Sequence, residues 1–144
     1  MFAPRNPANA YASVGMETGV SSADPHKLIV MLFDGALLSV STARNRMEAG
    51  DIPAKGQAIS QAINIIVNGL RASLDVESGG DLAEKLGALY DYMVARLLHA
   101  NMHNQIPPLN EVSTLLGELK DAWEQIGNLP AVTGAGAPAA VAAA

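Results

Sequence analysis

Two of the three histidines, His99 and His103, are four residues apart in a segment with helical periodicity. This spacing places both imidazoles on one face of a helix, as a metal site requires. The residues between them are Ala, Asn and Met, so the glutamate base of a metalloprotease helix is absent, and His26 lies in a different segment. Histidines in a last turn commonly do no more than face the negative end of the helix dipole. We therefore expect no metal and no cofactor, with a metal- or cofactor-binding helix bundle built on this pair as the alternative.

Acidic residues around the glycine pair 79–80 are the other candidate for chemistry. Asp75, Glu77 and Asp81 lack the spacing of a calcium-binding EF-hand, and the glycines lack the strand-before-helix setting of a phosphate loop. Asp81 is also explained as a helix cap, with Glu84 three residues on as in a capping box. Because no Ser/His/Asp arrangement or pair of carboxylates stands out in a helical protein, we expect no enzyme.

The composition excludes several classes of partner. The formal net charge is −5, the isoelectric point is near 5.0 and no Lys/Arg cluster occurs, so we expect no binding to nucleic acid. There is no cysteine, which fits a reducing compartment. The start of the chain lacks the layout of a signal peptide, and we find no run of about 18 apolar residues that could span a bilayer. We expect a cytoplasmic protein with no direct membrane insertion.

Helix start and stop signals divide the chain into four long helices. The predicted segments run from 24 to 47, from 51 to 74, from 81 to 102, and from beyond Pro107-Pro108 to near Gly127. Gly50 and the glycine pair stop the first two. Aromatic residues make up only 4% of the chain, which favours closely packed helices over sheets. The prediction is an all-α fold, with an antiparallel up-down-up-down four-helix bundle over residues 24–127.

Two end segments lie outside this bundle. Residues 1–23 form an N-terminal segment in which Asn6-Pro7 begins a short helix that carries Tyr11 and Val14. Residues 128–144 are rich in Ala and Gly and have neither charge nor periodicity, so we expect a disordered tail.

The first three helices carry more apolar side chains than one core-facing stripe needs, whereas the fourth is an ordinary amphipathic helix. The surplus residues are Leu28, Met31, Phe33, Leu37, Leu38, Ile65, Val67, Tyr92, Val94, Leu98 and Met102. Burying apolar surface contributes roughly 25 cal/mol per Å², so several exposed side chains of this kind leave several kcal/mol of burial free energy unused. A partner that covers them could gain this free energy. The alternative is a central helix that is buried on several sides within one bundle.

Three segments resemble the FliS-type flagellar secretion chaperones. They are DPHKLIVMLFDGALL at 24–38, SLDVESGGDLAEKLGALYDYMVARLLHAN at 73–101 and LLGELKDAWEQ at 115–125. The specific part is the combination of LYDYM, then RLLHAN at a fixed spacing, then DAW. The resemblance covers roughly residues 11 to 125. Phe33 stands where tyrosine is common in the family, and the tail matches nothing known there.

The resemblance implies a chaperone that binds the C-terminal segment of unpolymerised flagellin and prevents its premature polymerisation. It also implies docking of the loaded complex on the flagellar type III export gate. Separately from the resemblance, we expect the free protein to be a monomer or a weak homodimer that pairs through its exposed apolar surface. The family's N-terminal segment, with a tyrosine matching Tyr11, is expected to cover part of the flagellin site. Tyr11, Val14 and the surplus residues other than Val67 are therefore the expected partner-binding set.

Overall fold

The computed structural model describes residues 24–127, and within this range the chain is all-helical, without strands. The elements are α2 (Pro25–Glu48), α3 (Ile52–Asn64), η1 (Ile65–Leu70), η2 (Arg71–Ser73), α4 (Val76–His103) and α5 (Pro107–Gly127). The predicted all-α class with four long helices is confirmed for these residues. The predicted short N-terminal helix and the predicted disordered tail fall on 1–23 and 128–144, outside the described residues.

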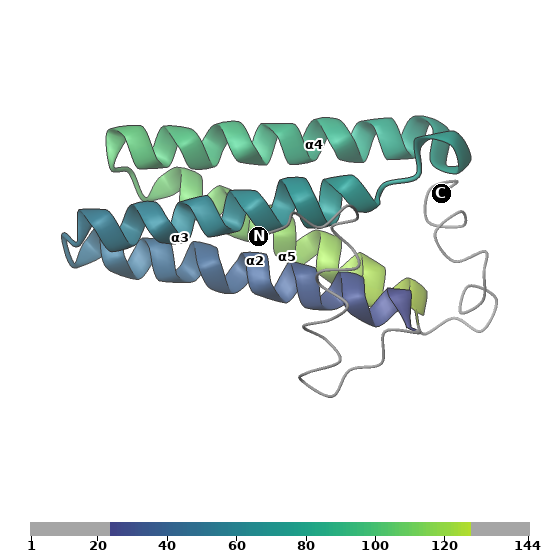
Figure 1. The fold of residues 1–144 in the computed structure, drawn as a ribbon, viewed down its shortest axis with the longest axis horizontal. Helices are drawn as coiled ribbons and strands as arrows, with labels where there is room; N and C mark the ends of the chain where they lie inside the picture. Colours follow the sequence, from purple (N-terminus) through teal and green to yellow (C-terminus); the bar gives the residue numbers. More distant parts are fainter. Residues whose placement is uncertain (1–23, 128–144) are drawn as a thin grey trace, which may run out of the picture.

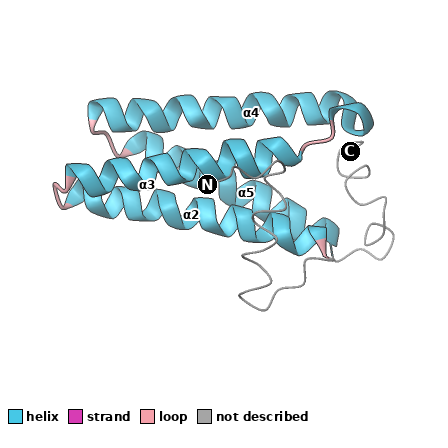
Figure 2. Ribbon diagram, viewed as in Figure 1, coloured by secondary structure: helices cyan, strands magenta, loops and turns pink. Residues whose placement is uncertain are grey.

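The helices lie side by side and the chain reverses direction at each short loop (Figures 1 and 2). α2 packs against α3 and α5, and α4 packs against the same two helices, so α2 and α4 are diagonal to each other. The core between them is made of aliphatic and methionine side chains, of which the largest fully buried are Val40, Ile59, Ile66, Met93, Leu97, Leu109, Val112 and Leu116. Tyr90 is also buried, and this burial raises the pKa of its hydroxyl.

Local capping bonds define the start of α2 and the turn between α2 and α3. The Asp24 carboxylate accepts a hydrogen bond from Lys27 N at 3.2 Å, and Asp51 accepts one from Ala54 N at 3.1 Å. Gly50, with a φ of +77°, ends α2 in a left-handed conformation that glycine adopts without steric cost. The amide of Gly50 donates to Met47 O and that of Asp51 to Arg46 O, which is the Schellman pattern.

The second helix differs from the regular α-helix that its periodicity predicts. After Asn64 it widens into the π-helical η1 and then tightens into the 3₁₀ turn η2. A π-helix has more residues per turn than an α-helix. Ile65, Ile66, Gly69 and Leu70 are buried in this segment.

The third helix, α4, includes a short helical segment before the predicted start at Asp81. Asp75, and not Asp81, is its N-cap, because the Asp75 carboxylate accepts hydrogen bonds from Ser78 N at 3.1 Å and from Ser78 Oγ at 2.7 Å. These bonds, the backbone one first, lower the pKa of Asp75. The predicted break at the glycine pair is a kink inside α4 at Gly80, whose φ is +54°. Because the backbone at Gly80 is non-helical, with a ψ of −133°, it separates two helices, and the predicted break before Asp81 is confirmed; the capping hydrogen bonds belong to Asp75, at the start of the short helix before the break.

One described helix, α2, is long and apolar enough to cross a membrane by length and composition alone, which corrects the expectation that no segment passes this test. Its most apolar window of 18 residues has a mean hydropathy of 1.3, and 39% of that window is buried. Core helices of soluble proteins pass the same test, so this is weak evidence for a membrane span. The apolar surplus of α2 accounts for it.

Candidate protein-binding surface

Four of the apolar residues predicted to bind a partner are exposed in the structure: Leu38 of α2, and Tyr92, Leu98 and Met102 of α4. Their exposed fractions run from 44% for Tyr92 to 78% for Met102, with Leu38 at 68%. Large exposed aliphatic side chains are the expected feature of a protein-binding surface. Three more residues of the predicted set are half-buried: Met31, Leu37 and Val94. Tyr11 and Val14 lie outside the described residues.

Three residues of the predicted set lie in the core, so the expectation that their side chains are surplus to it is wrong. Leu28 is 9% exposed, Phe33 3% and Ile65 6%. Leu28 and Phe33 are buried because α2 is contacted on two sides, by α3 and by α5, as the alternative of a central helix requires. Ile65 is buried because it faces α2, where a Cβ on Gly35 would be 3.4 Å from its Cδ1. These three residues are not part of the candidate surface.

The exposed side of α2 borders two different neighbours. On the α3 side lies Gly35, where a Cβ would be 3.4 Å from a side chain of η1. On the α5 side lies Asp34, whose Oδ1 is 2.7 Å from Lys120 Nζ. Met31 and Leu38 are seven residues apart, which puts them on one face of the helix, and at about 100° per residue this face lies between the directions of Gly35 and Asp34. We call Met31 and Leu38 the α2 patch.

Contacts near both ends fix the register between α3 and α4. At one end Lys55 Nζ donates a hydrogen bond to Asn101 O at 3.0 Å. At the other end Arg71 Nε donates to Asp91 Oδ1 at 2.7 Å, an ion pair that lowers the pKa of Asp91. The two segments therefore run antiparallel, with residue 55 near residue 101 and residue 71 near residue 91.

Between these two contacts, the seam of α3 and α4 is lined by aliphatic side chains. The register places Ile63 of α3 opposite Val94 of α4, and both are half-buried against the core. Val67 follows Ile63 by one turn, while Leu98 and Met102 follow Val94 at intervals of four residues, so each set shares a face of its helix. We call Ile63, Val67, Val94, Leu98 and Met102 the α3–α4 strip.

The outward face of α3, which separates the α2 patch from the strip, has no charged side chain. Its exposed polar residues are Gln57, Ser60, Gln61, Asn64 and Asn68. Lys55 is the one ionisable residue from Ile52 to Leu70, and it is only 3% exposed. Its ammonium group donates to Asn101 O and to Asn104 Oδ1, both at the C-terminal end of α4. A ligand crossing α3 would meet neutral amides and hydroxyls, which carry a small desolvation cost compared with charges.

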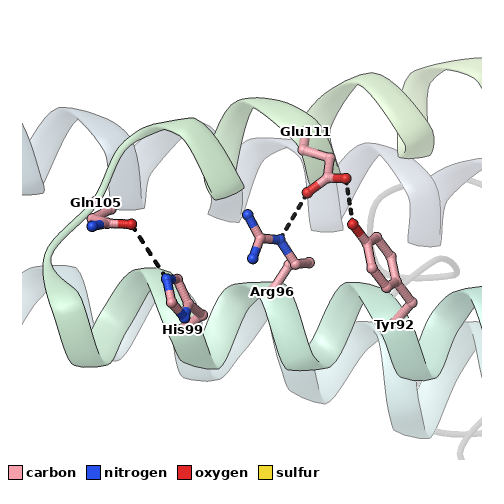
Figure 3. A network of polar contacts seen from close by, with 5 residues as sticks. All are labelled: Tyr92, Arg96, His99, Gln105 and Glu111. Carbon is pink, nitrogen blue, oxygen red and sulfur yellow. Dashed lines mark hydrogen bonds and ion pairs between the residues drawn. The ribbon is translucent and has the colours of Figure 1, made fainter.

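The other side of α4 is polar. Tyr92 donates its hydroxyl hydrogen to Glu111 Oε2 of α5 at 2.5 Å, and Arg96 Nε donates to Glu111 Oε1 at 2.8 Å (Figure 3). These bonds, that of Tyr92 first, lower the pKa of Glu111, and the same contact raises the pKa of Tyr92. The tyrosine predicted to bind a partner therefore has its hydroxyl engaged with α5.

Polar contacts also join α2 to α5. The Asp34–Lys120 ion pair raises the pKa of Lys120, and Arg44 Nη1 donates to Asn110 Oδ1 at 3.1 Å. Both seams beside α5 are thus crossed by charged groups, whereas the charged contacts between α3 and α4 lie near the two ends of their seam and the aliphatic α3–α4 strip lies between them. The candidate surface extends over α3, from the α2 patch to the strip.

The histidines lie in two separate places. His26 stacks on Trp123 with ring centroids 5.3 Å apart, its Nε2 is 2.6 Å from Trp123 O, and Trp123 Nε1 donates to His26 O at 3.1 Å. His99 and His103 lie at the other end of the molecule, with ring centroids 4.4 Å apart. Within residues 24–127, no group of three or more His, Cys, Asp or Glu side chains is placed to hold a metal ion.

Two features of this surface were not predicted. Ile52 is 51% exposed at the start of α3. It directly follows the capping residue Asp51, and this position indicates that Ile52 begins the helix and does not join the core stripe. Glu111 was assigned only to the polar side of the last helix. Its contacts with Tyr92 and Arg96 join two helices, and no periodicity within one helix reveals such a pairing.

Comparison with known proteins identifies a family for most of the chain. The family model described as "Flagellar protein FliS" matches residues 7–130. The flagellar secretion chaperone FliS of Salmonella typhimurium (strain LT2) is 54% identical over 117 residues, which cover 81% of this chain and 87% of the relative. FliSB of Pseudomonas aeruginosa, named in the same way, is 48% identical over 82% of this chain and 93% of its own length. FliS of Escherichia coli (strain K12) is 45% identical over 87% and 91%.

Proposed function

We propose that this chain, which belongs to the FliS family of flagellar secretion chaperones, holds the C-terminal segment of unpolymerised flagellin until export. The family is one of chaperones and not of enzymes. The observation that carries the proposal is the aliphatic surface on both sides of the uncharged α3 face. An unfolded export client presents amphipathic helical segments, and Leu, Ile and Met side chains bury such segments without strict shape matching.

The client contacts the α2 patch and the α3–α4 strip at once. α2 and α4 are diagonal in an antiparallel up-down-up-down bundle, so a single straight helix lying along one of them does not reach both. A client that passes over α3 does reach both, and it meets no charged side chain on the way. Ordering an unfolded segment costs conformational entropy, and an extended contact supplies the area needed to offset it.

The N-terminal segment of the chain, with Tyr11 and Val14, covers part of this surface in the free protein and is displaced by the client. We further propose that the protein works in the cytoplasm, as a monomer or weak homodimer. The loaded complex docks on the flagellar type III export gate. Neither nucleic acid nor membrane insertion has a part in this function.

The test is calorimetric titration of the full-length chain with the C-terminal segment of flagellin from the same organism. We expect a 1:1 complex with a negative heat-capacity change, because apolar surface is buried. The variant Leu98→Asp places a charge in the α3–α4 strip and is expected to weaken binding at least tenfold. The matched control is Thr114→Asp, which adds the same charge at an exposed position of α5. Absence of binding at micromolar concentrations, or equal losses in the two variants, would refute the proposal.

A further inference from the structure

The C-terminal end of α4 holds two imidazoles and an amide oxygen close together. His99 and His103 are one turn apart, with ring centroids separated by 4.4 Å and planes tilted by 45°. His99 Nε2 is also 3.3 Å from Oε1 of Gln105, which lies in the turn between α4 and α5 (Figure 3). These three side chains take no part in the candidate protein-binding surface, since they lie on the α5 side of α4.

The separation of the two rings suits a shared metal ion. With a metal–nitrogen distance of about 2.0–2.1 Å, each ring centroid lies about 3.2 Å from the ion, so two imidazoles bound at a right angle have centroids about 4.5 Å apart. A tetrahedral angle would require about 5.2 Å by the same geometry. The observed 4.4 Å corresponds to neighbouring positions of a square-planar or octahedral ion.

Gln105 is placed to act as a third donor. Two donor atoms bound to one ion at about 2.0–2.2 Å are about 2.9–3.5 Å apart when the angle between them is 90–110°. The 3.3 Å between His99 Nε2 and Gln105 Oε1 corresponds to an angle of about 104°, and a shift of the Gln105 side chain by a few tenths of an ångström brings the angle to about 90°, as in a square-planar or octahedral ion. A bound ion would replace the hydrogen bond between these atoms, and solvent would complete its coordination.

The electrostatic surroundings contain opposing contributions. The last turn of α4 presents the negative end of the helix dipole, which favours a cation. Lys55 is a nearby positive charge, but its ammonium group is engaged by Asn101 O and Asn104 Oδ1. Arg96, one turn before His99, is paired with Glu111 at 2.8 Å. The neighbouring cations therefore have partners of their own.

We infer that His99, His103 and Gln105 form a surface site for a late first-row divalent cation. Imidazole nitrogens suit copper, nickel and zinc, and a tetragonal arrangement of nitrogen and oxygen donors is typical of Cu²⁺ and Ni²⁺. The general order of affinities also places Cu²⁺ above Ni²⁺ and Zn²⁺. Cu²⁺ is the ion expected to bind most tightly, and it would tie the last turn of α4 to the turn that follows it. This site is independent of the proposed chaperone function.

The test uses the untagged full-length chain at neutral pH, titrated separately with Cu²⁺ and Zn²⁺ while heat and visible absorbance are recorded. We expect one Cu²⁺ per chain, with affinity at least tenfold above that for Zn²⁺. His99→Ala and His103→Ala should each lower the Cu²⁺ affinity at least tenfold, and Gln105→Ala should lower it by a smaller factor. Ni²⁺ should raise the melting temperature of the original chain and not that of His103→Ala.

The control is His26→Ala, which removes the remaining histidine at the opposite end of the molecule and should leave Cu²⁺ binding unchanged. Circular dichroism confirms that each variant keeps its helix content. Equal Cu²⁺ affinity in the original chain and in His103→Ala would overturn the inference, as would failure of the chain to bind Cu²⁺ at tens of micromolar. Loss of binding in His26→Ala alone would place the ion at the other end of the bundle and refute it equally.

Discussion

Leu38 and Phe33 were predicted together as partner-binding residues, and the structure now predicts opposite behaviour for them. Leu38 is 68% exposed, whereas Phe33 is 3% exposed. Leu38→Ala should therefore change the free energy of unfolding by no more than about 0.5 kcal/mol, as exposed substitutions usually do. Phe33→Ala should lower it by about 3–5 kcal/mol, the usual loss for a buried aromatic side chain.

The expected effect on client binding follows from the same exposed fraction. Burying a whole leucine side chain contributes about 1.5–3 kcal/mol. Because 68% of Leu38 is still exposed in the free protein, the client can gain about 1–2 kcal/mol from it. That corresponds to a dissociation constant raised about 5- to 30-fold in Leu38→Ala.

Urea denaturation and calorimetric titration with the flagellin C-terminal segment measure the two quantities separately. Phe33→Leu is the matched control, since it keeps an apolar side chain in the core and should recover most of the stability lost in Phe33→Ala. The reasoning is refuted if Leu38→Ala unfolds as easily as Phe33→Ala, or if it binds the client as tightly as the original chain does.

Three further substitutions test the features that hold the helices. The pKa of Glu111 is lowered in the folded protein, so the contacts of its carboxylate stabilise the fold above the ordinary pKa of 4.5. This stabilisation is lost as the pH falls through the lowered pKa of the folded state. Glu111→Gln should therefore make the melting temperature less dependent on pH in that acidic range. Lys55→Ala leaves Asn101 O and Asn104 Oδ1 without their donor and should cost about 1–3 kcal/mol in urea denaturation. Gly50→Ala introduces a Cβ at a φ of +77° and should cost about 1–2 kcal/mol, whereas unchanged stability would mean that the turn rearranges.

The features predicted correctly from the sequence are those that depend on a few neighbouring residues. Asp24, Asp51 and Gly50 each cap or end a helix through hydrogen bonds within four or five positions of themselves. Local chemistry of this kind can be read before the fold is known.

The errors arise where tertiary packing changes the local pattern. Ile65 was placed outside the core because a single core-facing stripe was assumed for its helix, whereas its side chain also packs against α2 at Gly35. Phe33 was placed outside the core because the periodicity of one helix does not predict how many other helices pack against it. In the structure both α3 and α5 pack against α2. Tyr92 was correctly predicted to be exposed, but its contact with Glu111 depends on how α4 and α5 meet.

The stacked pair His26 and Trp123 has a consequence for the order of the helices along the chain. It holds the first turn of α2 against the last part of α5, so the two ends of the described unit are adjacent. Chains with adjacent ends tolerate circular permutation, because a short linker can join them without disturbing the core. A permuted protein in which 127 is linked to 24 and the chain is opened at the exposed turn of Gly50 and Asp51 should keep the same helices. In such a protein the packing of the four helices would be separated from the order in which the ribosome makes them.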